Sequence, residues 1–267
     1  MSAVHTRIAP TPSGYLHKGN AYNFLLAQQL VKENGGTLRL RIDDSDTVRS
    51  KPEYLQDIFD CLHWLGIEWH KGPQTVKEQQ ENYNQQLRLP RYHQLIEELI
   101  ATNKVYACNC SRKEILTHHN GHYPGTCRHK NTRLHQPDMS LRLLVPEGTT
   151  IHFKDKLKGN VHIDISQTLG DFIIRRRDGL PAFHTVSLVD DTDFEINTVV
   201  RGEDLLESTA AQLYMSRLLG LDTFNQIQFY HHPLFRDEQG NKLSKSAGSL
   251  SLKWMRENGI QAKDIFA

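Results

Sequence analysis

The sequence predicts an α/β protein whose main domain is interrupted by a smaller, strand-rich segment. A strand, a helix and a second strand are predicted within the first 42 residues, which is a βαβ arrangement. The middle of the chain instead has short alternating stretches with closely spaced cysteines and histidines, and helical periodicity returns near Leu205. We therefore expect a main domain in two parts, residues 1–103 and 186–267, with an inserted subdomain over 104–185.

The opening βαβ unit follows from local patterns. Residues 6–9 form a short strand candidate, and the Pro- and Gly-rich stretch 10–14 prevents a helix until apolar positions at helical spacing begin at Ala21. The Asn-Gly-Gly stretch 34–36 ends that helix. Alternating apolar and polar residues over 37–42 then predict the second strand.

Two more helices are predicted before the pattern changes. Ser50 and Pro52 suit the cap and the first turn of a helix whose apolar stripe reaches Leu65 and which ends at Gly66. A second apolar stripe predicts a helix over about 90–102.

The rest of the chain holds further elements of both kinds. Alternation predicts strands within 141–145 and 151–165 of the insertion. Helical spacing recurs over 205–220, and residues 227–230 have the composition of a buried strand.

Composition limits the location and the partners. The chain has 267 residues, and 32 Lys and Arg against 31 Asp and Glu leave a formal charge of +1. A net charge this close to zero creates no long-range electrostatic attraction for nucleic acid or an anionic membrane. Any site for a polyanion must therefore be a local basic patch. No stretch approaches the ~18 apolar residues of a membrane span, and the N-terminus lacks a signal-peptide core. We expect a cytoplasmic monomer that does not bind membranes.

The loop before the first long helix carries residues suited to binding a phosphate. Gly14 and Gly19 leave the backbone accessible, and a helix N-terminus favours anions through its free N–H groups and its dipole. His17 can donate to a phosphate oxygen on which charge develops during phosphoryl or nucleotidyl transfer. The alternative is a tight turn in which His17 is only a solvated cap.

A second candidate motif lies near the other end of the chain. Lys242 and Lys245 lie three residues apart between Gly240 and Gly248. Their ammonium groups, with neighbouring hydroxyls such as that of Ser244, can neutralise a departing pyrophosphate when such a loop closes. The alternative is a solvated basic loop.

Together, the two segments resemble the HIGH and KMSKS signatures of class I aminoacyl-tRNA synthetases. They are His17-Lys18-Gly19-Asn20 and residues 242–246, KLSKS. The flanking sequences RIAPTPSGYLH, GGTLRLRIDDSDTVRS and VVRGEDLL resemble the glutamyl branch. The resemblance implies a Rossmann-type catalytic domain with an inserted acceptor-binding subdomain. It also implies that ATP, with Mg²⁺, activates an amino acid as its adenylate.

The resemblance further implies which residues bind the two substrates. The residues expected to bind ATP are Gly14, His17, Gly19, Asn20, Lys242, Ser244 and Lys245, and the catalytic ones are His17, Lys242 and Lys245. Those expected to bind L-glutamate are Arg7, Ala9, Thr11, Asp43, Phe183 and Arg201.

Chemistry agrees with the glutamate assignments but leaves alternatives. Guanidinium groups pair bidentately with carboxylates, so Arg7 and Arg201 can hold the substrate's carboxylates while Asp43 takes its α-ammonium. Arg201 can instead pair with a neighbouring acid, and Asp43 can cap a turn. The glutamyl branch has Glu at position 43 and Tyr at the position of Phe183, and the Asp also resembles the glutaminyl branch. Glutamine therefore stays an alternative.

Three cysteines form a candidate metal site. Cys108, Cys110 and Cys127 offer soft ligands at a spacing that a tetrahedral zinc ion can bridge. Coordination chemistry alone favours a histidine as the fourth ligand, either His129 or one of His118, His119 and His122. The pattern Cys-x-Cys with Tyr-x-x-x-Cys, however, resembles the zinc site of glutamyl-queuosine tRNA(Asp) synthetases, short paralogues of glutamyl-tRNA synthetase, and implies Tyr123.

The length supports the short paralogue. After residue 246 only 21 residues remain, too few for a helical anticodon-binding domain. In the short family the catalytic body receives the anticodon stem-loop of tRNA(Asp), and glutamate is transferred to the cyclopentene diol of queuosine at the wobble position. Basic clusters at 154–158 and 175–177 are candidates for phosphate contacts, with a solvated surface as the alternative.

Three other functions remain open. A truncated glutamyl-tRNA synthetase body would charge the 3′ end of tRNA, and a nucleotidylyltransferase of the same superfamily would adenylate a small acid without tRNA. A non-catalytic paralogue would only bind zinc and RNA. The cysteine cluster argues against the nucleotidylyltransferase, and His17 with Lys242 and Lys245 argues against lost catalysis.

Overall fold

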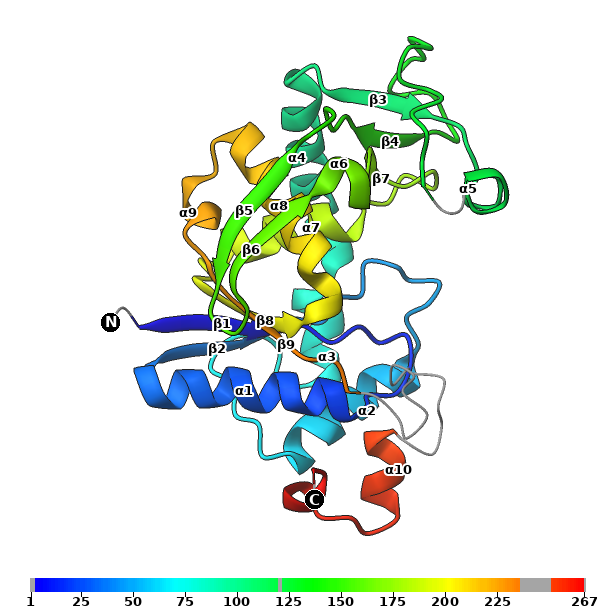
Figure 1. The fold of residues 1–267 in the computed structure, drawn as a ribbon. Helices are drawn as coiled ribbons and strands as arrows, with labels where there is room; N and C mark the ends of the chain where they lie inside the picture. Colours follow the sequence, from blue (N-terminus) through cyan, green and yellow to red (C-terminus); the bar gives the residue numbers. More distant parts are fainter. Residues whose placement is uncertain (1–2, 120–121, 236–250, 267) are drawn as a thin grey trace. The chain divides into compact units, whose positions relative to one another are not determined.

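The computed structural model describes residues 3–119, 122–235 and 251–266 (Figure 1). The chain forms two compact units. The first comprises Met1–Leu87, Ile196–Asp204 and Gln228–Ala267, and the second comprises Arg88–Glu195 and Leu205–Ile227. The predicted insertion, residues 104–185, lies within the second unit, and its two boundaries stay predictions.

The first unit is built on parallel strand pairs, and the predicted βαβ opening is confirmed. Strands β1 (Val4–Ile8) and β2 (Gly36–Leu40) pair in parallel and are connected by α1 (Lys18–Asn34). Strands β8 (Thr198–Gly202) and β9 (Gln228–His232) form a second parallel pair, which includes the strand predicted at 227–230.

The two pairs meet at β1 and β8. Asn197, just before β8, donates from its backbone N to the carbonyl of His5 at 3.0 Å, and its side-chain oxygen accepts from His5 N at 2.9 Å. Further along, Arg7 Nη1 donates to the Val200 carbonyl at 3.4 Å. These contacts run in the same direction along both strands, so the carboxyl ends of β1, β2, β8 and β9 lie at one edge.

A glycine permits the close start of β1 and β2. Gly36 has φ +122°, and a Cβ there would lie 2.1 Å from the carbonyl oxygen of Val4. No residue with a side chain fits this position. The Asn-Gly-Gly sequence therefore ends α1 and also admits the strand pairing.

The core of the first unit lies where α1 and α2 (Pro52–Trp64) pack with the strands. Ile58 and Leu62 of α2 are fully buried in it, and Cys61 is buried as predicted. Each fully buried side chain of this size contributes about 1.5–3 kcal/mol. The predicted cap of α2 was wrong by one residue, because the helix begins at Pro52 and its N-cap is Lys51.

Short elements complete the first unit. They are α3 (Val76–Glu78), a π-helical turn η1 (Gln79–Tyr83), the 3-10 turns η2 (Gln85–Arg88), η3 (Glu203–Leu205) and η5 (Ala262–Asp264), and α10 (Leu252–Glu257). Arg256 of α10 donates to Asp57 Oδ1 at 2.9 Å and to Cys61 Sγ at 3.1 Å, which fastens α10 to α2.

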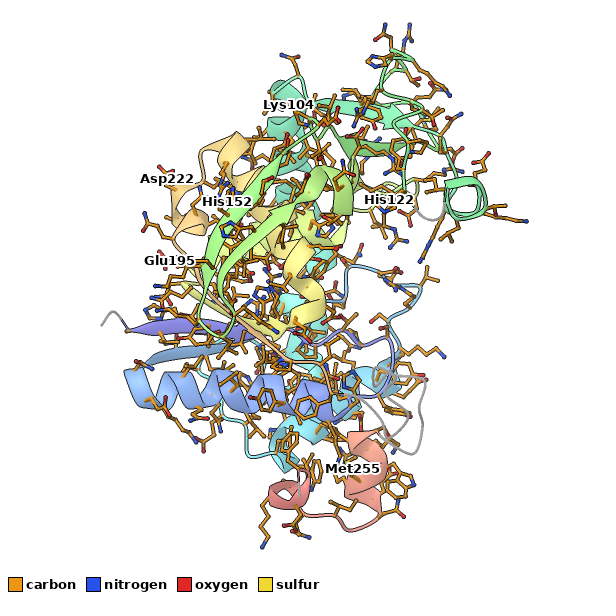
Figure 2. The ribbon with its side chains drawn as sticks, in the orientation of Figure 1. Lys104, His122, His152, Glu195, Asp222 and Met255 are labelled. Atoms are coloured by element: carbon orange, nitrogen blue, oxygen red, sulfur yellow. The ribbon has the colours of Figure 1, made fainter. Side chains whose placement is uncertain are left out.

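The second unit combines an antiparallel sheet, a hairpin and helices. The sheet has the order β3 (Val105–Cys108), β4 (Ser140–Leu143), β7 (Phe172–Arg175), and β5 (Thr150–Asp155) pairs with β6 (Gly159–Asp164). Its helices are α4 (Leu89–Ala101), α5 (Arg112–His119), α6 (Ile165–Thr168), α7 (Phe183–Asp193), α8 (Leu206–Leu219) and α9 (Asp222–Asn225). His152 of β5, which is labelled in Figure 2, lies opposite His162 of β6. The rings of the two histidines are in contact.

A buried carboxylate joins two helices of the second unit. Asp190 of α7 is fully buried and accepts hydrogen bonds from Arg88 Nε at 2.7 Å and from the Tyr92 hydroxyl of α4 at 2.9 Å.

Within the described ranges, no helix is long and apolar enough to cross a membrane.

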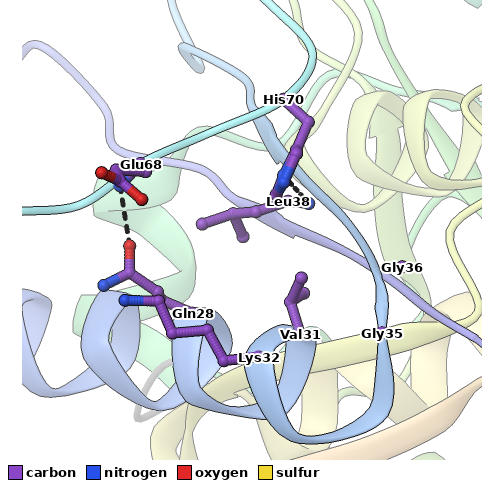
Figure 3. Close-up of a pocket in the computed structure, with 8 residues that line it drawn as sticks. All are labelled: Gln28, Val31, Lys32, Gly35, Gly36, Leu38, Glu68 and His70. Atoms are coloured by element: carbon purple, nitrogen blue, oxygen red, sulfur yellow. Dashed lines mark hydrogen bonds between the residues drawn. The ribbon is translucent and has the colours of Figure 1, made fainter.

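A cavity of about 300 Å³ lies in the first unit, where α1 ends and β2 begins (Figure 3). Its lining includes Gly35, Leu38 and His70, and the His70 ring accepts from Leu38 N at 3.1 Å. The cavity lies toward the amino ends of the strands, away from the loops described next.

Candidate active site

His17 caps the first turn of α1. Its Nδ1 accepts from Gly19 N at 3.1 Å, while Asn20 Oδ1 accepts from His17 N at 3.0 Å, so the two side chains form a reciprocal capping box. Because Nδ1 is an acceptor, a neutral His17 carries its proton on Nε2. Nε2 is then the atom able to donate to a phosphate oxygen at this helix N-terminus.

The glycines of this motif have different environments. A Cβ at Gly19 would lie 3.0 Å from Cε1 of His17, so the absence of a side chain lets the His17 ring lie over the first turn. Gly14 is buried in the loop between β1 and α1. Asn20, predicted to contact ATP, uses its side-chain oxygen in the cap.

The loop after β1 runs beside the extension of β2. Arg41 N donates to the Ile8 carbonyl at 3.0 Å, and Asp43 N donates to the Pro10 carbonyl at 2.9 Å. The structure therefore brings Asp43 alongside the segment that contains Ala9 and Thr11.

Two buried arginines lie on the neighbouring strands β1 and β8. Arg7 and Arg201 are 5% and 4% exposed, and the guanidinium of Arg201 lies 5.5 Å from the ring centre of Phe229. Buried cations of this kind favour carboxylate ligands, which match the guanidinium in charge and geometry.

The other predicted site residues lie elsewhere. Phe183 is the first residue of α7, in the second unit, and is 43% exposed. Lys242, Ser244 and Lys245 lie outside the described residues.

The described residues that flank positions 236–250 contact the start of α1. The ring of Phe235 lies 5.2 Å from that of Tyr22. On the other side, Ser251 forms an antiparallel bridge with His17, and Leu252 N donates to the Leu16 carbonyl at 2.7 Å. The chain thus enters and leaves this segment beside the His17 turn.

One histidine at the same edge was not predicted. His232, the last residue of β9, is buried, and its Nε2 lies 3.4 Å from Asn23 Nδ2 of α1. Burial lowers the pKa of His232, although the carbonyl of Pro233 and nearby carboxylates oppose the shift. A histidine in a strand-like stretch gives no sequence signal of this placement.

A buried polar network behind Asp43 was also missed. Arg41 Nε donates to Asp43 Oδ1 at 2.6 Å, and Gln85 Nε2 donates to the same oxygen at 3.2 Å. Asp44 accepts from Gln85 N at 2.9 Å and from Gln79 Nε2 at 2.7 Å. Burial raises the pKa of Asp44 to about 6, against the opposing effect of these hydrogen bonds.

The three predicted cysteines converge in the second unit. The Sγ atoms of Cys108, Cys110 and Cys127 lie within 4.8 Å of one another, and those of Cys110 and Cys127 are 3.7 Å apart. The Tyr123 hydroxyl lies 3.4 Å from Cys108 Sγ. Tetrahedral zinc requires about 3.8 Å between two sulfurs and about 3.5 Å between sulfur and oxygen. The residues therefore fit a zinc ion.

The thiols of the cluster differ in acidity. Burial raises the pKa of Cys110 to about 12. Burial also acts to raise the pKa of Cys127, but hydrogen bonds with Asn109, Tyr123 and the other thiols outweigh it and lower the pKa to about 7. The thiolate is the form of cysteine that binds a metal, and sulfur ligands suit soft metals such as zinc.

An ion pair between a buried carboxylate and a partly exposed arginine lies beside the cluster. Asp171 accepts from Arg128 Nε at 2.6 Å and Nη2 at 2.8 Å, and also from the Tyr106 hydroxyl. The guanidinium of Arg142 lies 3.7 Å from the ring centre of Tyr123.

The rival fourth ligands are placed differently. His129 and His122 are exposed, and neither joins the three thiols within the described ranges. The side chains of His118 and His119 lie outside the described part of the chain.

The comparisons identify the family. The model for the catalytic domain of class I tRNA synthetases (E and Q) matches residues 3–267. The chain belongs to this family.

Two relatives within the family carry different names. A glutamyl-Q tRNA(Asp) synthetase from Nitratidesulfovibrio vulgaris is 36% identical over 278 residues, which cover 98% of this chain and 84% of that protein. A glutamate–tRNA ligase from Hydrogenobaculum sp. (strain Y04AAS1) is 34% identical over 277 residues, 98% of this chain and 57% of that protein. The chain thus spans little more than half of the ligase.

A solved structure supports the fold. A glutamate tRNA ligase from Elizabethkingia meningosepticum, in complex with its amino acid, matches with a TM-score of 0.73 at 26% identity, covering 93% of this chain and 53% of that one. The α/β Rossmann-like synthetase fold with a parallel sheet, expected from the motifs, is therefore confirmed.

Proposed function

We propose that the chain activates L-glutamate with ATP as glutamyl-adenylate and transfers the glutamyl group to the cyclopentene diol of queuosine in the anticodon stem-loop of tRNA(Asp). The observation that carries the proposal is the His17-capped N-terminus of α1, at the strand edge where Arg7 and Arg201 are buried. The relative named glutamyl-Q tRNA(Asp) synthetase, matched over 84% of its length, supports the choice of acceptor.

In the first step a glutamate carboxylate oxygen attacks the α-phosphorus of ATP, and the bond to pyrophosphate breaks. Mg²⁺ accompanies ATP as in the family. His17 Nε2–H and the dipole of α1 stabilise the charge that develops on the phosphate oxygens. The attacking carboxylate is already ionised, so catalysis is positioning and charge stabilisation rather than base catalysis.

The remaining ATP contacts are assigned to the same turn and to the second motif. Gly14, Gly19 and Asn20 supply backbone near the nucleotide, and Lys242 and Lys245 neutralise pyrophosphate, with the Ser244 hydroxyl beside them. Phe235 and Ser251, the described residues on either side of positions 236–250, contact the start of α1.

Glutamate is held by charge. Arg7 and Arg201 take its carboxylates, Asp43 takes the α-ammonium, and Ala9 and Thr11 line the same strand edge. Phe183 stays a predicted glutamate contact, at a position where the glutamyl branch has Tyr.

In the second step a queuosine hydroxyl attacks the carbonyl of the mixed anhydride, and the bond to AMP breaks. The hydroxyl proton passes to the departing phosphate oxygen.

Zinc has a structural role in the proposal. Cys108, Cys110, Cys127 and Tyr123 would hold it, and the ion would supply a four-coordinate crosslink within the second unit.

A second candidate keeps the chemistry but changes the acceptor. The ligase relative at 34% identity supports a catalytic body that charges the 3′ end of tRNA.

Activation is tested by exchange of labelled pyrophosphate into ATP. We expect exchange with glutamate and only background with glutamine or no amino acid. Absence of exchange with glutamate refutes the proposal, and exchange with glutamine alone reassigns the amino acid.

A further inference from the structure

Gln85 contacts three consecutive residues of the β2 extension. Its side-chain Nε2 donates to Asp43 Oδ1 at 3.2 Å, its backbone N donates to Asp44 Oδ1 at 2.9 Å, and its Oε1 accepts from Ser45 N at 3.0 Å. Gln85 is 1% exposed, so water does not compete for these contacts. One side chain therefore fixes the backbone and the carboxylate of the segment that carries Asp43.

The orientation of the Gln85 amide is determined by chemistry. The backbone N–H of Ser45 can only donate, so the group facing it must be the amide oxygen. The amide NH₂ group then faces Asp43. Gln85 thus acts as a donor toward a carboxylate, and its two side-chain contacts depend on each other.

Asp43 is held from two sides. Arg41, which is 5% exposed, donates to Oδ1 at 2.6 Å and to Oδ2 at 3.2 Å, and Gln85 approaches Oδ1. An Asp carboxylate has a shorter reach than a Glu carboxylate. Its orientation therefore decides how well it meets a substrate ammonium, since a misplacement of about 1 Å can cost ~100-fold in rate.

A second layer holds Gln85 itself. Asp44 is 6% exposed and accepts from Gln85 N and from Gln79 Nε2. Gln79 begins the π-helical turn Gln79–Tyr83. Such turns are rare in proteins overall, but those that occur are often at functional sites. In this turn the Gln79 side chain donates to Asp44.

We propose that Gln85 is a positioning residue for the amino-acid substrate, which orients the Asp43 carboxylate toward the α-ammonium. The inference rests on the proposed function, because it assigns the partner of Asp43 within the glutamate site. It extends the site to Gln85, which lies 42 positions from Asp43 along the chain.

The discriminating variant is Gln85→Glu. It retains an acceptor for Ser45 N but replaces the donor that faces Asp43 by a second carboxylate oxygen, which repels it. The matched control is Gln86→Glu. Gln86 Nε2 donates to the Ser45 carbonyl at 2.6 Å, so the control makes the same chemical change and also loses one hydrogen bond, without facing Asp43.

The measurements are the KM values for glutamate and ATP in pyrophosphate exchange, and inhibition by glutarate, which lacks the α-ammonium. For Gln85→Glu we expect the KM for glutamate to rise about tenfold while the KM for ATP and the inhibition constant of glutarate change less than about twofold. Gln86→Glu is expected to stay within about threefold of wild type in all three.

Other outcomes separate the two proposals. An equal rise of the glutamate KM and the glutarate inhibition constant in Gln85→Glu would overturn the positioning role, as would identical behaviour of the two variants. If Gln85→Glu does not fold, Gln85→Met removes the donor without adding charge, and the same selective rise is expected. Absence of exchange by the wild-type chain would instead refute the proposed function.

Discussion

Replacing Asp44 by asparagine is expected to make the stability of the fold less dependent on pH. Asp44 is 6% exposed, and burial raises its pKa from the ordinary value of 3.8 to about 6. Hydrogen bonds from Gln85 and Gln79 oppose this shift, and the charge of Asp43 adds to it. The folded state therefore holds a proton on Asp44 more tightly than the unfolded state does.

The sign of the pH dependence follows from this difference. Between pH 3.8 and about 6 the folded state binds more protons, so the free energy of unfolding falls as the pH rises. The stabilising contribution of Asp44 to the free energy of unfolding is fully present below pH 3.8 and is lost above about pH 6. The difference between the two pKa values corresponds to about 3 kcal/mol.

Asparagine fits the same position without a charge. Its amide oxygen can accept from Gln85 N, and its NH₂ group can donate to Gln79 once the Gln79 amide turns over. Gln79 Oε1 is buried and has no hydrogen-bond partner among the described residues, so it is suited to accept. The variant therefore keeps both contacts and loses the cost of ionisation.

The assay is urea unfolding of wild type and Asp44→Asn at pH 4 and pH 7.5. Relative to the variant, wild type is expected to lose about 2 kcal/mol of unfolding free energy between these values. The exposed Asp264→Asn is the control and should follow wild type. A wild-type-to-Asp44→Asn difference that is the same at both pH values, within about 0.5 kcal/mol, would refute the reasoning.

Three further predictions concern the site and the metal cluster. His17→Asn keeps an N-cap residue but loses the Nε2 donor, so we expect the exchange rate to fall about 100-fold at unchanged melting temperature; an unchanged rate contradicts the role of His17. Cys127→Ser should reduce the zinc content measured by mass spectrometry well below about one ion per chain, and full retention would remove Cys127 from the ligand set. Asp171→Asn weakens the hydrogen bonds that the buried Asp171 carboxylate accepts from Arg128 and from Val145 N, and is expected to cost about 2 kcal/mol in urea unfolding; a cost below about 0.5 kcal/mol would show that these contacts are not structural.

Local patterns sufficed for the opening of the fold. Apolar periodicity and the Asn-Gly-Gly stop predicted the first βαβ unit, because those signals act within one element. The start of α1 was placed too late, at Ala21, since the helix begins at Lys18 with His17 as its cap. His17 was named as a cap only in the alternative interpretation, because histidine is an uncommon N-cap residue.

Helix α7 shows where the pattern fails. Its buried side chains include Thr185, Ser187, Asp190 and Asp191. Polar residues in the buried face remove the apolar stripe on which the sequence prediction of a helix depends. Their partners lie far along the chain, as the bond between Asp190 and Tyr92 shows.

The sequence marks the motif residues of the candidate site but not the residues that support them. The motif residues Arg7, His17 and Asp43 carry distinctive chemistry in a recognisable order. Gln79 and Gln85 have no such signal, because a glutamine in a polar stretch is normally solvated. Only the tertiary fold brings Gln85 to Asp43, so this layer could not be predicted from the sequence.

The most direct test of the account is transfer of labelled glutamate, with ATP, to two matched tRNA pools, one from cells that make queuosine and one from cells that cannot. The account predicts label only on the queuosine-containing pool, on tRNA(Asp). Equal labelling of both pools would contradict it and would assign the chain to charging of the tRNA 3′ end.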